Sequence, residues 1–405
     1  MPGKKYVLTL AYGTLSEAEV EAYLTNLNLN YRVVGRVGRC LILEAEEISP
    51  QIWSGLAGIH KVAEVFAEVS GAEELKLDLL ADSASDKMRW AVSTYSDSRD
   101  SAEDFAEALQ RRLKEAFKAW GVRKTKMLRG ELYNVGSSWE YEVFSQRLQE
   151  ERVVEEGLEV LAVEHRNWLI GRTIAVVDHL GYRRRDLVRP IQDPKITIPP
   201  KLARILVNLT GCRRGDTLLD PFCGLGTILA EAVMCGVNVI GVDADAGRVE
   251  GARRNLRWLM EQHKIDGVKV EIYVGYAEKL HKILKDRFVD GVATEPILLP
   301  PLKQPPPDQE AERLLEKAGE TYYKGLPSIS KHLKPEGRAA IVIPCVKTRS
   351  RRVLSFDLAA EASRFGLRLC RLTSVEKFPI LVEDPTQMVM RGVYLFKKAE
   401  KLSFT

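Results

Sequence analysis

Short apolar runs alternate with longer segments of helical periodicity across residues 206–398. Apolar runs without polar alternation are typical of parallel strands that are buried on both faces, and the periodic segments between them predict helices that cover those faces. The predicted strands are 217–219, 237–242, 268–274, 289–294, 338–343, 367–373 and 389–397. The pattern therefore predicts an α/β domain in residues 197–405.

The first part of the chain has a different order of elements. Residues 5–67 read as strand, helix, strand, strand, helix and strand, with a turn between Gly35 and Gly38 that indicates a hairpin. Pro50 follows Ser49 at the expected start of the second helix. This βαββαβ order predicts a small ferredoxin-like α+β domain in residues 1–69.

A second small block begins after a polar segment at 70–86. A strand at 90–93 precedes a long helix, which we expect Ser101 to cap and which runs to Trp120. Two apolar strands close the block at 159–163 and 168–177. Basic side chains, including Arg123 and Lys124, follow the helix directly. A solvated helix face is the simplest interpretation of such charges.

Composition narrows the class of protein. The chain has 405 residues, 45% of them hydrophobic and 29% charged, which is typical of a soluble globular protein with two to three domains. Its apolar runs stay well below the about 20 residues that a membrane helix needs, and its N-terminus lacks a secretory core, so we expect no membrane partner and a cytoplasmic location. The six cysteines are scattered without metal-ligand spacing, which predicts reduced thiols and no metal. A net charge of +4 permits a nucleic-acid partner without arguing for one.

The most informative segment is 220–227, which reads Asp-Pro-Phe-Cys-Gly-Leu-Gly-Thr between a predicted strand and a predicted helix. Its glycines permit a sharp turn and leave no Cβ between the backbone and a ligand. The first amides of the helix are unpaired and favour an electron-rich group. The next strand ends in Asp243, a carboxylate placed to accept hydrogen bonds from ribose hydroxyls. These features predict a nucleotide-like ligand at the carboxyl edge of the sheet.

This segment resembles the cofactor loop of class I S-adenosylmethionine-dependent methyltransferases, in the form found in amino-group methylases of RNA and DNA. The resemblance implies a Rossmann-like sheet closed by an antiparallel strand pair, and S-adenosylmethionine as the cofactor. The cofactor-binding residues that it implies are Asp220, Phe222, Gly224, Gly226, Thr227, Asp243, Ala244, Tyr276 and Ala277. For Phe222, packing under the loop is the structural alternative, and for Thr227 it is capping of the helix. Tyr276 stands where the family carries an aspartate, so we expect it to bond or stack on adenine.

The fourth predicted strand leads into Thr294-Glu295-Pro296-Ile297-Leu298, where amino-group methylases carry Asp/Asn-Pro-Pro-Tyr/Phe. A conjugated exocyclic amine is a poor nucleophile, and an acceptor that bonds its N–H atoms holds it in line with the methyl group. The resemblance implies that Glu295 orients the amine, that Pro296 supplies loop backbone, and that Leu298 covers the base in place of an aromatic ring. A catalytically silent relative that still binds RNA is the alternative.

Residues 86–178 resemble a THUMP domain, the RNA-end-binding module of several tRNA-modifying enzymes. The likeness rests on the strand and long helix, the Gly-x-Arg that follows them at 121–123, the stretch that starts at Ser137-Ser138, and the closing segment 171–178. Glu140 and Glu142 depart from it, because they place negative charge where the family is often basic.

An arginine-rich segment, 182–190, joins this block to the α/β domain. Its four guanidiniums beside a tyrosine suit phosphates and a stacked base, although a solvated linker is the alternative. The candidate RNA-binding residues are Arg183, Arg184, Arg185, Arg189, Arg123 and Lys124.

The order of these parts is similar to that of archaeal-type tRNA guanosine N2-methyltransferases. The similarity implies a ferredoxin-like domain (1–69), a THUMP-like domain (86–178) that grips the acceptor end of tRNA, an Arg-rich linker (179–196), and a methyltransferase domain (197–405) that methylates a guanine N2 amine. We expect tRNA as partner and a monomeric chain, and an accessory subunit stays open. A DNA amino-methylase is a further alternative, since the cofactor loop alone does not separate RNA from DNA.

Overall fold

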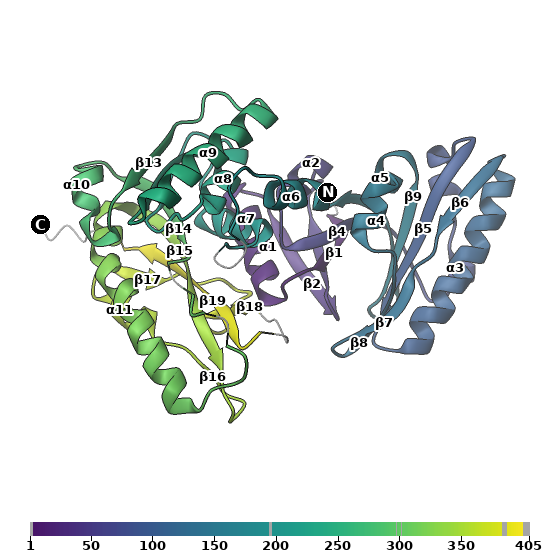
Figure 1. Cartoon of the computed structure of the whole chain (residues 1–405). Coiled ribbons are helices and arrows are strands. Elements are labelled where there is room, and N and C mark those ends of the chain that lie inside the picture. The colour runs from purple at the N-terminus through teal and green to yellow at the C-terminus, as the bar shows by residue number, and fades with distance from the viewer. Residues whose placement is uncertain (1–2, 194–196, 297, 301, 383–386, 400–405) are drawn as a thin grey trace, which may run out of the picture. The chain divides into compact units, whose positions relative to one another are not determined.

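The computed structural model describes residues 3–193, 197–296, 298–300, 302–382 and 387–399 (Figure 1). Two positions of the predicted catalytic loop, Ile297 and Pro301, and the end of the predicted linker at 194–196 lie outside the described residues. The chain forms two compact units. The first contains the described residues up to Glu17 together with Leu27–Gly181, and the second contains Ala18–Asn26 together with the described residues from Tyr182 onward.

The first unit is built on one ten-stranded sheet. Its strands are β1 (Lys4–Leu10), β2 (Tyr31–Val37), β3 (Cys40–Ala45), β4 (Ile59–Val69), β5 (Lys87–Ser96), β6 (Lys124–Leu128), β7 (Glu131–Val135), β8 (Ser138–Glu142), β9 (Leu158–Glu164) and β10 (Trp168–Val176). Their order is β2-β3-β1-β4-β10-β9-β5-β8-β7, with β6 beside β5. The antiparallel part β2-β3-β1-β4 has the order of a ferredoxin-like sheet. Since β4 also pairs with β10, the sheet runs continuously through residues 1–69 and 86–178.

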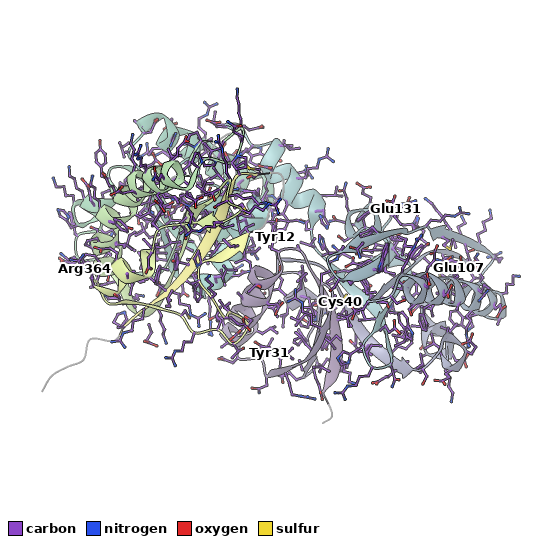
Figure 2. The ribbon with its side chains drawn as sticks, turned by 90° about the horizontal axis from the view of Figure 1, so that it is seen from below. Tyr12, Tyr31, Cys40, Glu107, Glu131 and Arg364 are labelled. Carbon is purple, nitrogen blue, oxygen red and sulfur yellow. The ribbon has the colours of Figure 1, made fainter. Side chains whose placement is uncertain are left out.

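Helices pack on this sheet through apolar stripes. They are α1 (Thr14–Asn26), shared with the second unit, α2 (Pro50–Trp53), α3 (Arg99–Ala119), α4 (Ser145–Glu150) and α5 (Val153–Glu156). The expected cap of the long helix α3, Ser101, is wrong: Ser98 caps the helix by accepting from the Ser101 amide, and α3 begins at Arg99. Phe105 of α3 stacks on Trp168 of β10 at a centroid distance of 3.8 Å, whereas Glu107 lies on the exposed face of the helix (Figure 2).

Charged side chains are buried inside the first unit. Lys61 on β4 is fully buried, and its Nζ lies 2.8 Å from Glu159 Oε1 and 3.1 Å from Glu142 Oε1. Burial alone lowers the pKa of Lys61, but the two carboxylates raise it above its usual value. Arg39 pairs with both Glu142 and Glu140. Glu140 and Glu142, which depart from the THUMP pattern, are therefore internal partners of Lys61 and Arg39.

The second unit is built on a nine-stranded sheet. Its strands are β11 (Thr217–Asp220), β12 (Asn238–Asp243), β13 (Val270–Val274), β14 (Val289–Thr294), β15 (Leu333–Lys347), β16 (Val353–Leu354), β17 (Leu367–Leu369), β18 (Ile380–Val382) and β19 (Val389–Lys398). The order is β13-β12-β11-β14-β15-β19-β17, with β16 beside β15 and β18 beside β19. The first five strands are parallel, and β19 is antiparallel to both β15 and β17. The predicted Rossmann-like sheet with its antiparallel closing pair is confirmed.

Helices cover both faces of this sheet (Figure 1). They are α7 (Pro200–Thr210), α8 (Thr227–Met234), α9 (Ala246–His263), α10 (Leu280–Leu284), α11 (Asp308–His332) and α12 (Leu358–Ser363), while α6 (His179–Leu187) spans the boundary between the units. Helix α6 occupies part of the segment that the sequence indicated as a linker. No helix in the described part of the chain is long and apolar enough to cross a membrane. Among the same residues, no cluster of His, Cys, Asp and Glu side chains is arranged to hold a metal ion.

The second unit also includes residues 18–26, the larger part of helix α1. Glu19 accepts a hydrogen bond from the side-chain amide of Asn208 on α7 at 2.7 Å. Glu21 accepts from the backbone amides of Thr373 and Ser374 at 2.7 and 2.8 Å. Side-chain and backbone hydrogen bonds therefore tie this segment to residues far along the chain.

Candidate active site

The glycine turn after β11 leads the chain directly into helix α8. Gly224 and Gly226 both have positive φ, at 51° and 83°, which a residue with a Cβ adopts only under strain. A Cβ on Gly226 would also lie 2.9 Å from Leu256 Cδ1 of α9. On Gly224 a Cβ would meet nothing within 4 Å, so the backbone is open on that side. The turn thus has one closely packed side and one open side.

Asp243, at the end of β12, holds the turn in place. Its Oδ2 accepts from the backbone amide of Gly224 at 2.9 Å, and its Oδ1 accepts from the amide of Asp245 at 3.0 Å. A carboxylate has about four acceptor sites, so these two bonds leave capacity for ligand hydroxyls. Asp245 itself caps α9 by accepting from Gly247 and Arg248.

Asp220 ends β11 and is buried beneath the turn. Its Oδ1 accepts from Thr294 Oγ1 at 2.7 Å and from the amide of Phe222 at 3.1 Å, which joins the ends of β11 and β14. Burial raises the pKa of Asp220 to about 7, against these two hydrogen bonds, which favour the ionised form. The buried Asp220 side chain thus fixes the start of the glycine turn relative to the end of β14.

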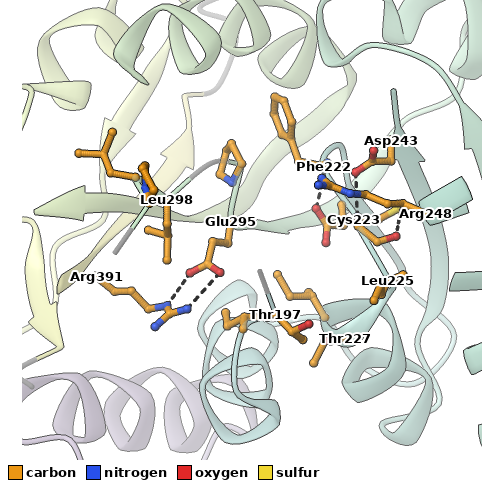
Figure 3. Close-up of a pocket in the computed structure, with 17 residues that line it drawn as sticks. Thr197, Phe222, Cys223, Leu225, Thr227, Asp243, Arg248, Glu295, Leu298 and Arg391 are labelled. Atoms are coloured by element: carbon orange, nitrogen blue, oxygen red, sulfur yellow. Dashed lines mark hydrogen bonds and ion pairs between the residues drawn. The ribbon is translucent and has the colours of Figure 1, made fainter. Parts of the chain in front are cut away.

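Glu295 directly follows β14 and forms an ion pair with Arg391 of β19. Arg391 Nε lies 2.6 Å from Glu295 Oε1, and Nη2 lies 3.5 Å from Oε2 (Figure 3). The two side chains are only 8% and 18% exposed, for Glu295 and Arg391 respectively, so the contact is largely shielded from water. Burial raises the pKa of Glu295, and the Arg391 guanidinium opposes this rise.

One cavity of about 510 Å³ joins the glycine turn to the loop that contains Glu295 (Figure 3). Its lining includes the predicted residues Asp220, Phe222, Gly224, Thr227, Asp243, Glu295, Pro296 and Leu298. It also includes residues that sequence reasoning did not assign to a site: Thr197, Ile198, Leu225, Arg248, Leu299 and Arg391. The structure therefore brings the predicted cofactor loop and the predicted catalytic loop to one space.

Four of the predicted cofactor residues do not line this cavity. Gly226 lies behind the turn, packed against α9, and Ala277 is buried in the short helix after β13. Ala244 is on the surface. Tyr276 is 57% exposed, and its ring carries the Lys279 ammonium at 5.2 Å from the centroid. The expected contact between Tyr276 and adenine therefore has no support from the cavity.

Residues 188–366 match UPF0020, the RMKL-like methyltransferase domain. The chain is 33% identical over 178 residues to a tRNA (guanine(10)-N2)-dimethyltransferase of Methanothermobacter thermautotrophicus, covering 44% of this chain and 47% of the relative. It is 34% identical over 157 residues to the protein of the same name from Pyrococcus abyssi, covering 38% and 41%. The chain thus spans less than half the length of these curated relatives.

The fold similarity extends further than the sequence match. The crystal structure of TrmN from Thermus thermophilus superimposes with a TM-score of 0.53 at 17% identity and covers 97% of this chain and 99% of that one. At this identity the likeness concerns the fold alone. Together with the strand order, it supports a Rossmann-like class I fold for the second unit.

The predicted RNA-binding residues divide into two groups. Arg183, Arg184, Arg123 and Lys124 are exposed, and Arg123 pairs with Asp86. Arg185 and Arg189 are buried inside the second unit instead.

Both buried arginines have internal partners on α8 of the second unit. Arg185 donates to Glu231 at 2.7 Å, and Arg189 donates to Thr227 Oγ1 at 2.7 Å. These guanidiniums hold α6 and the following turn against α8. We therefore do not propose Arg185 and Arg189 as RNA contacts.

Sequence reasoning missed Arg391 and Arg248. The sequence did contain a signal for Arg391, which is the one charged residue in the apolar stretch Val389-Met390-Arg391-Gly392-Val393. A charge in a buried strand needs a partner. The sequence did not indicate which partner. Arg248 lies in the first turn of α9, and nothing local distinguishes it from the other arginines of that helix.

Proposed function

We propose that this protein methylates the exocyclic N2 amine of a guanine in tRNA. The observation that carries the proposal is the single cavity that the glycine turn and the Glu295 loop line together. A cofactor side without a base side would suit a binding protein, whereas amine methylation needs both around one space. The names of the archaeal relatives support guanine N2 and tRNA as the substrate class.

The residues of the turn fit the cofactor. The open side of Gly224 admits a ligand to the backbone, Asp243 has acceptor capacity for ribose hydroxyls, and about 510 Å³ is of the size expected for a bound nucleoside. When bound, S-adenosylmethionine supplies an electrophilic methyl group on its sulfonium sulfur.

The residues of the second loop would act on the base. Glu295 would accept an N–H of the amine and orient its lone pair, and the backbone at Pro296 would border the same atoms. Leu298 and Leu299 would cover the base by apolar contact. These residues would hold the amine nitrogen in line with the methyl group, and the Glu295 carboxylate or solvent would take the proton that the nitrogen releases on methylation.

The first unit is proposed to hold the tRNA, with a THUMP-like block in residues 86–178 that grips the acceptor end. Arg183, Arg184, Arg123 and Lys124 are the exposed cations that we assign to phosphate contacts. The domain boundaries, the monomeric state and the cytoplasmic location stay predictions.

Transfer of a labelled methyl group from S-adenosylmethionine to bulk tRNA tests the proposal. Nucleoside mass spectrometry of the product should detect N2-methylguanosine or its dimethyl form. Label in DNA but not in tRNA would favour the DNA amino-methylase. Cofactor binding without transfer to either would favour a silent RNA-binding relative, and no binding at all would contradict the cofactor assignment.

Substitution of Gly226 by alanine is expected to weaken S-adenosylmethionine binding by about 10- to 100-fold, because a non-glycine residue with positive φ costs about 1–3 kcal/mol and the added Cβ also meets Leu256. Isothermal calorimetry measures the change. Gly215→Ala is the matched control, since Gly215 has a φ of 90° but nothing within 4 Å of its would-be Cβ. Equal affinity of the two variants would show that the turn after β11 does not shape the cofactor site.

A further inference from the structure

Arg391 reaches Glu295 across an intervening strand. Arg391 pairs with Pro344 of β15, and β15 separates β19 from β14 in the sheet. The guanidinium nevertheless lies 2.6 Å from the carboxylate at the end of β14. The contact thus lies at the carboxyl edge of the sheet, where the cavity opens.

This ion pair is costly for the fold. Its neighbours on β19, Val389, Met390 and Val393, are buried, and the removal of two charges from water is seldom repaid by their attraction alone. Apolar side chains in the same places would stabilise the sheet as well or better. A function for the pair is the more economical explanation, and both members line the cavity.

We propose that Arg391 is a positioning residue that fixes the Glu295 carboxylate and keeps it ionised toward the substrate amine. This inference rests on the proposed function of the same cavity. Two N–H groups of the planar guanidinium, Nε and Nη2, face the two carboxylate oxygens, which restricts rotation of the carboxylate. Since a carboxylate has about four acceptor sites, the remaining ones stay available to the N–H atoms of a base.

The surroundings of Glu295 explain why its ionised form needs the Arg391 guanidinium. Besides Arg391 on β19, the charged side chains that line the described cavity are Asp220 on β11, Asp243 on β12 and Arg248 on α9. Burial disfavours a charge on Glu295 and raises its pKa, and of these charged groups Arg391 is the one that opposes the rise. Without Arg391, the pKa of Glu295 rises further, so a smaller fraction is ionised at a given pH. The acid limb of the pH–rate profile, where the rate falls as Glu295 is protonated, therefore moves to higher pH.

The test compares Arg391→Gln and Arg391→Lys with the unchanged protein in single-turnover methyl transfer to tRNA across pH. We expect Arg391→Gln to lower the rate about 10- to 100-fold, the cost of a misplaced catalytic group, and to shift the acid limb upward while S-adenosylmethionine affinity stays unchanged. Arg391→Lys should restore the charge but not the two-point contact, and so recover the rate only in part. Arg364→Gln breaks an exposed arginine–glutamate pair with Glu361 and is the matched control, expected to be without effect.

A double-mutant cycle decides whether Arg391 acts through Glu295. In a Glu295→Gln background, Arg391→Gln should change the rate no further. An equal loss in both backgrounds, or an unshifted acid limb in Arg391→Gln, would overturn the proposal.

A carboxyl titration separates this inference from the proposed function. Glutamate labelled with carbon-13 reports the Glu295 pKa by NMR, with Glu295→Gln for assignment, and needs no tRNA. A higher pKa in Arg391→Gln supports the inference even if no methyl reaches tRNA, and an unchanged pKa contradicts it. Failure of transfer in the unchanged protein refutes only the proposed function.

Discussion

Replacement of Glu295 by glutamine is expected to lower methyl transfer to tRNA by about 100- to 10,000-fold, the range for loss of a positioned acid–base group. Glutamine keeps the size of the side chain but replaces one oxygen with an NH₂ donor. Arg391 would hold the remaining oxygen, because a guanidinium only donates hydrogen bonds. The amide would then present N–H groups to the substrate amine, donor against donor. Single-turnover transfer of a labelled methyl group measures the loss.

Two controls keep this result specific. Glu271→Gln removes a carboxylate from an exposed pair with Arg287 in the same unit and should leave the rate unchanged. Calorimetry should find S-adenosylmethionine binding intact in Glu295→Gln, because the glycine turn and Asp243 are untouched. Full activity of Glu295→Gln would remove this residue from the mechanism.

Replacement of Lys61 by methionine is expected to destabilise the first unit by about 3–5 kcal/mol, the cost of breaking a buried ion pair from one side. Methionine fills a similar volume but leaves Glu142 and Glu159 without their shared cation. The pKa of Glu142, which burial raises but Lys61 and Arg39 lower to about 2, should rise as a consequence. Hydrogen exchange of β4, β5 and β9 in the full chain measures the loss of stability at its source.

A surface pair provides the comparison for Lys61. Lys5→Met breaks a contact with Glu68 in which both side chains are more than a third exposed, so it should cost less than about 1 kcal/mol. Adding Glu159→Gln to Lys61→Met should recover part of the loss, because one unpaired charge is then removed. Similar costs for Lys61→Met and Lys5→Met would mean that the buried network contributes little to this sheet.

The parts of the site that the sequence predicts are those set by local geometry. The order strand, glycine turn, helix, strand, acid already implies where Asp243 must lie, since parallel strands end at one edge of a sheet. The pairing of Glu295 with Arg391 could not be read this way, because 96 residues separate them and the apolar pattern of a strand does not say which strand lies beside it. The same holds for Arg185 and Glu231, whose burial turns an apparent phosphate-binding arginine into a packing element.

Helix α11 illustrates a second limit. From Asp308, α11 continues to His332 through Gly319, Gly325 and Pro327. These residues have low helix propensity, but Tyr322, Leu326 and Ile329 are buried in the core of the second unit, and burial of that face outweighs propensity. Gly325 lies beside the Phe222 ring, since a Cβ there would be in ordinary contact with it at 3.6 Å. The packing of Phe222 is therefore shared between the turn and a helix 100 residues away.

The assignment of residues 18–26 to the second unit affects how the protein can be made. During synthesis this segment leaves the ribosome well before Asn208, and long before Thr373 and Ser374, whose amides Glu21 binds. Contacts between such distant parts of a chain form late and slow folding. A nascent chain must therefore keep this early helix from wrong partners until nearly all of the protein has emerged, and a fragment that starts at the arginine-rich segment would lack a piece of the second unit.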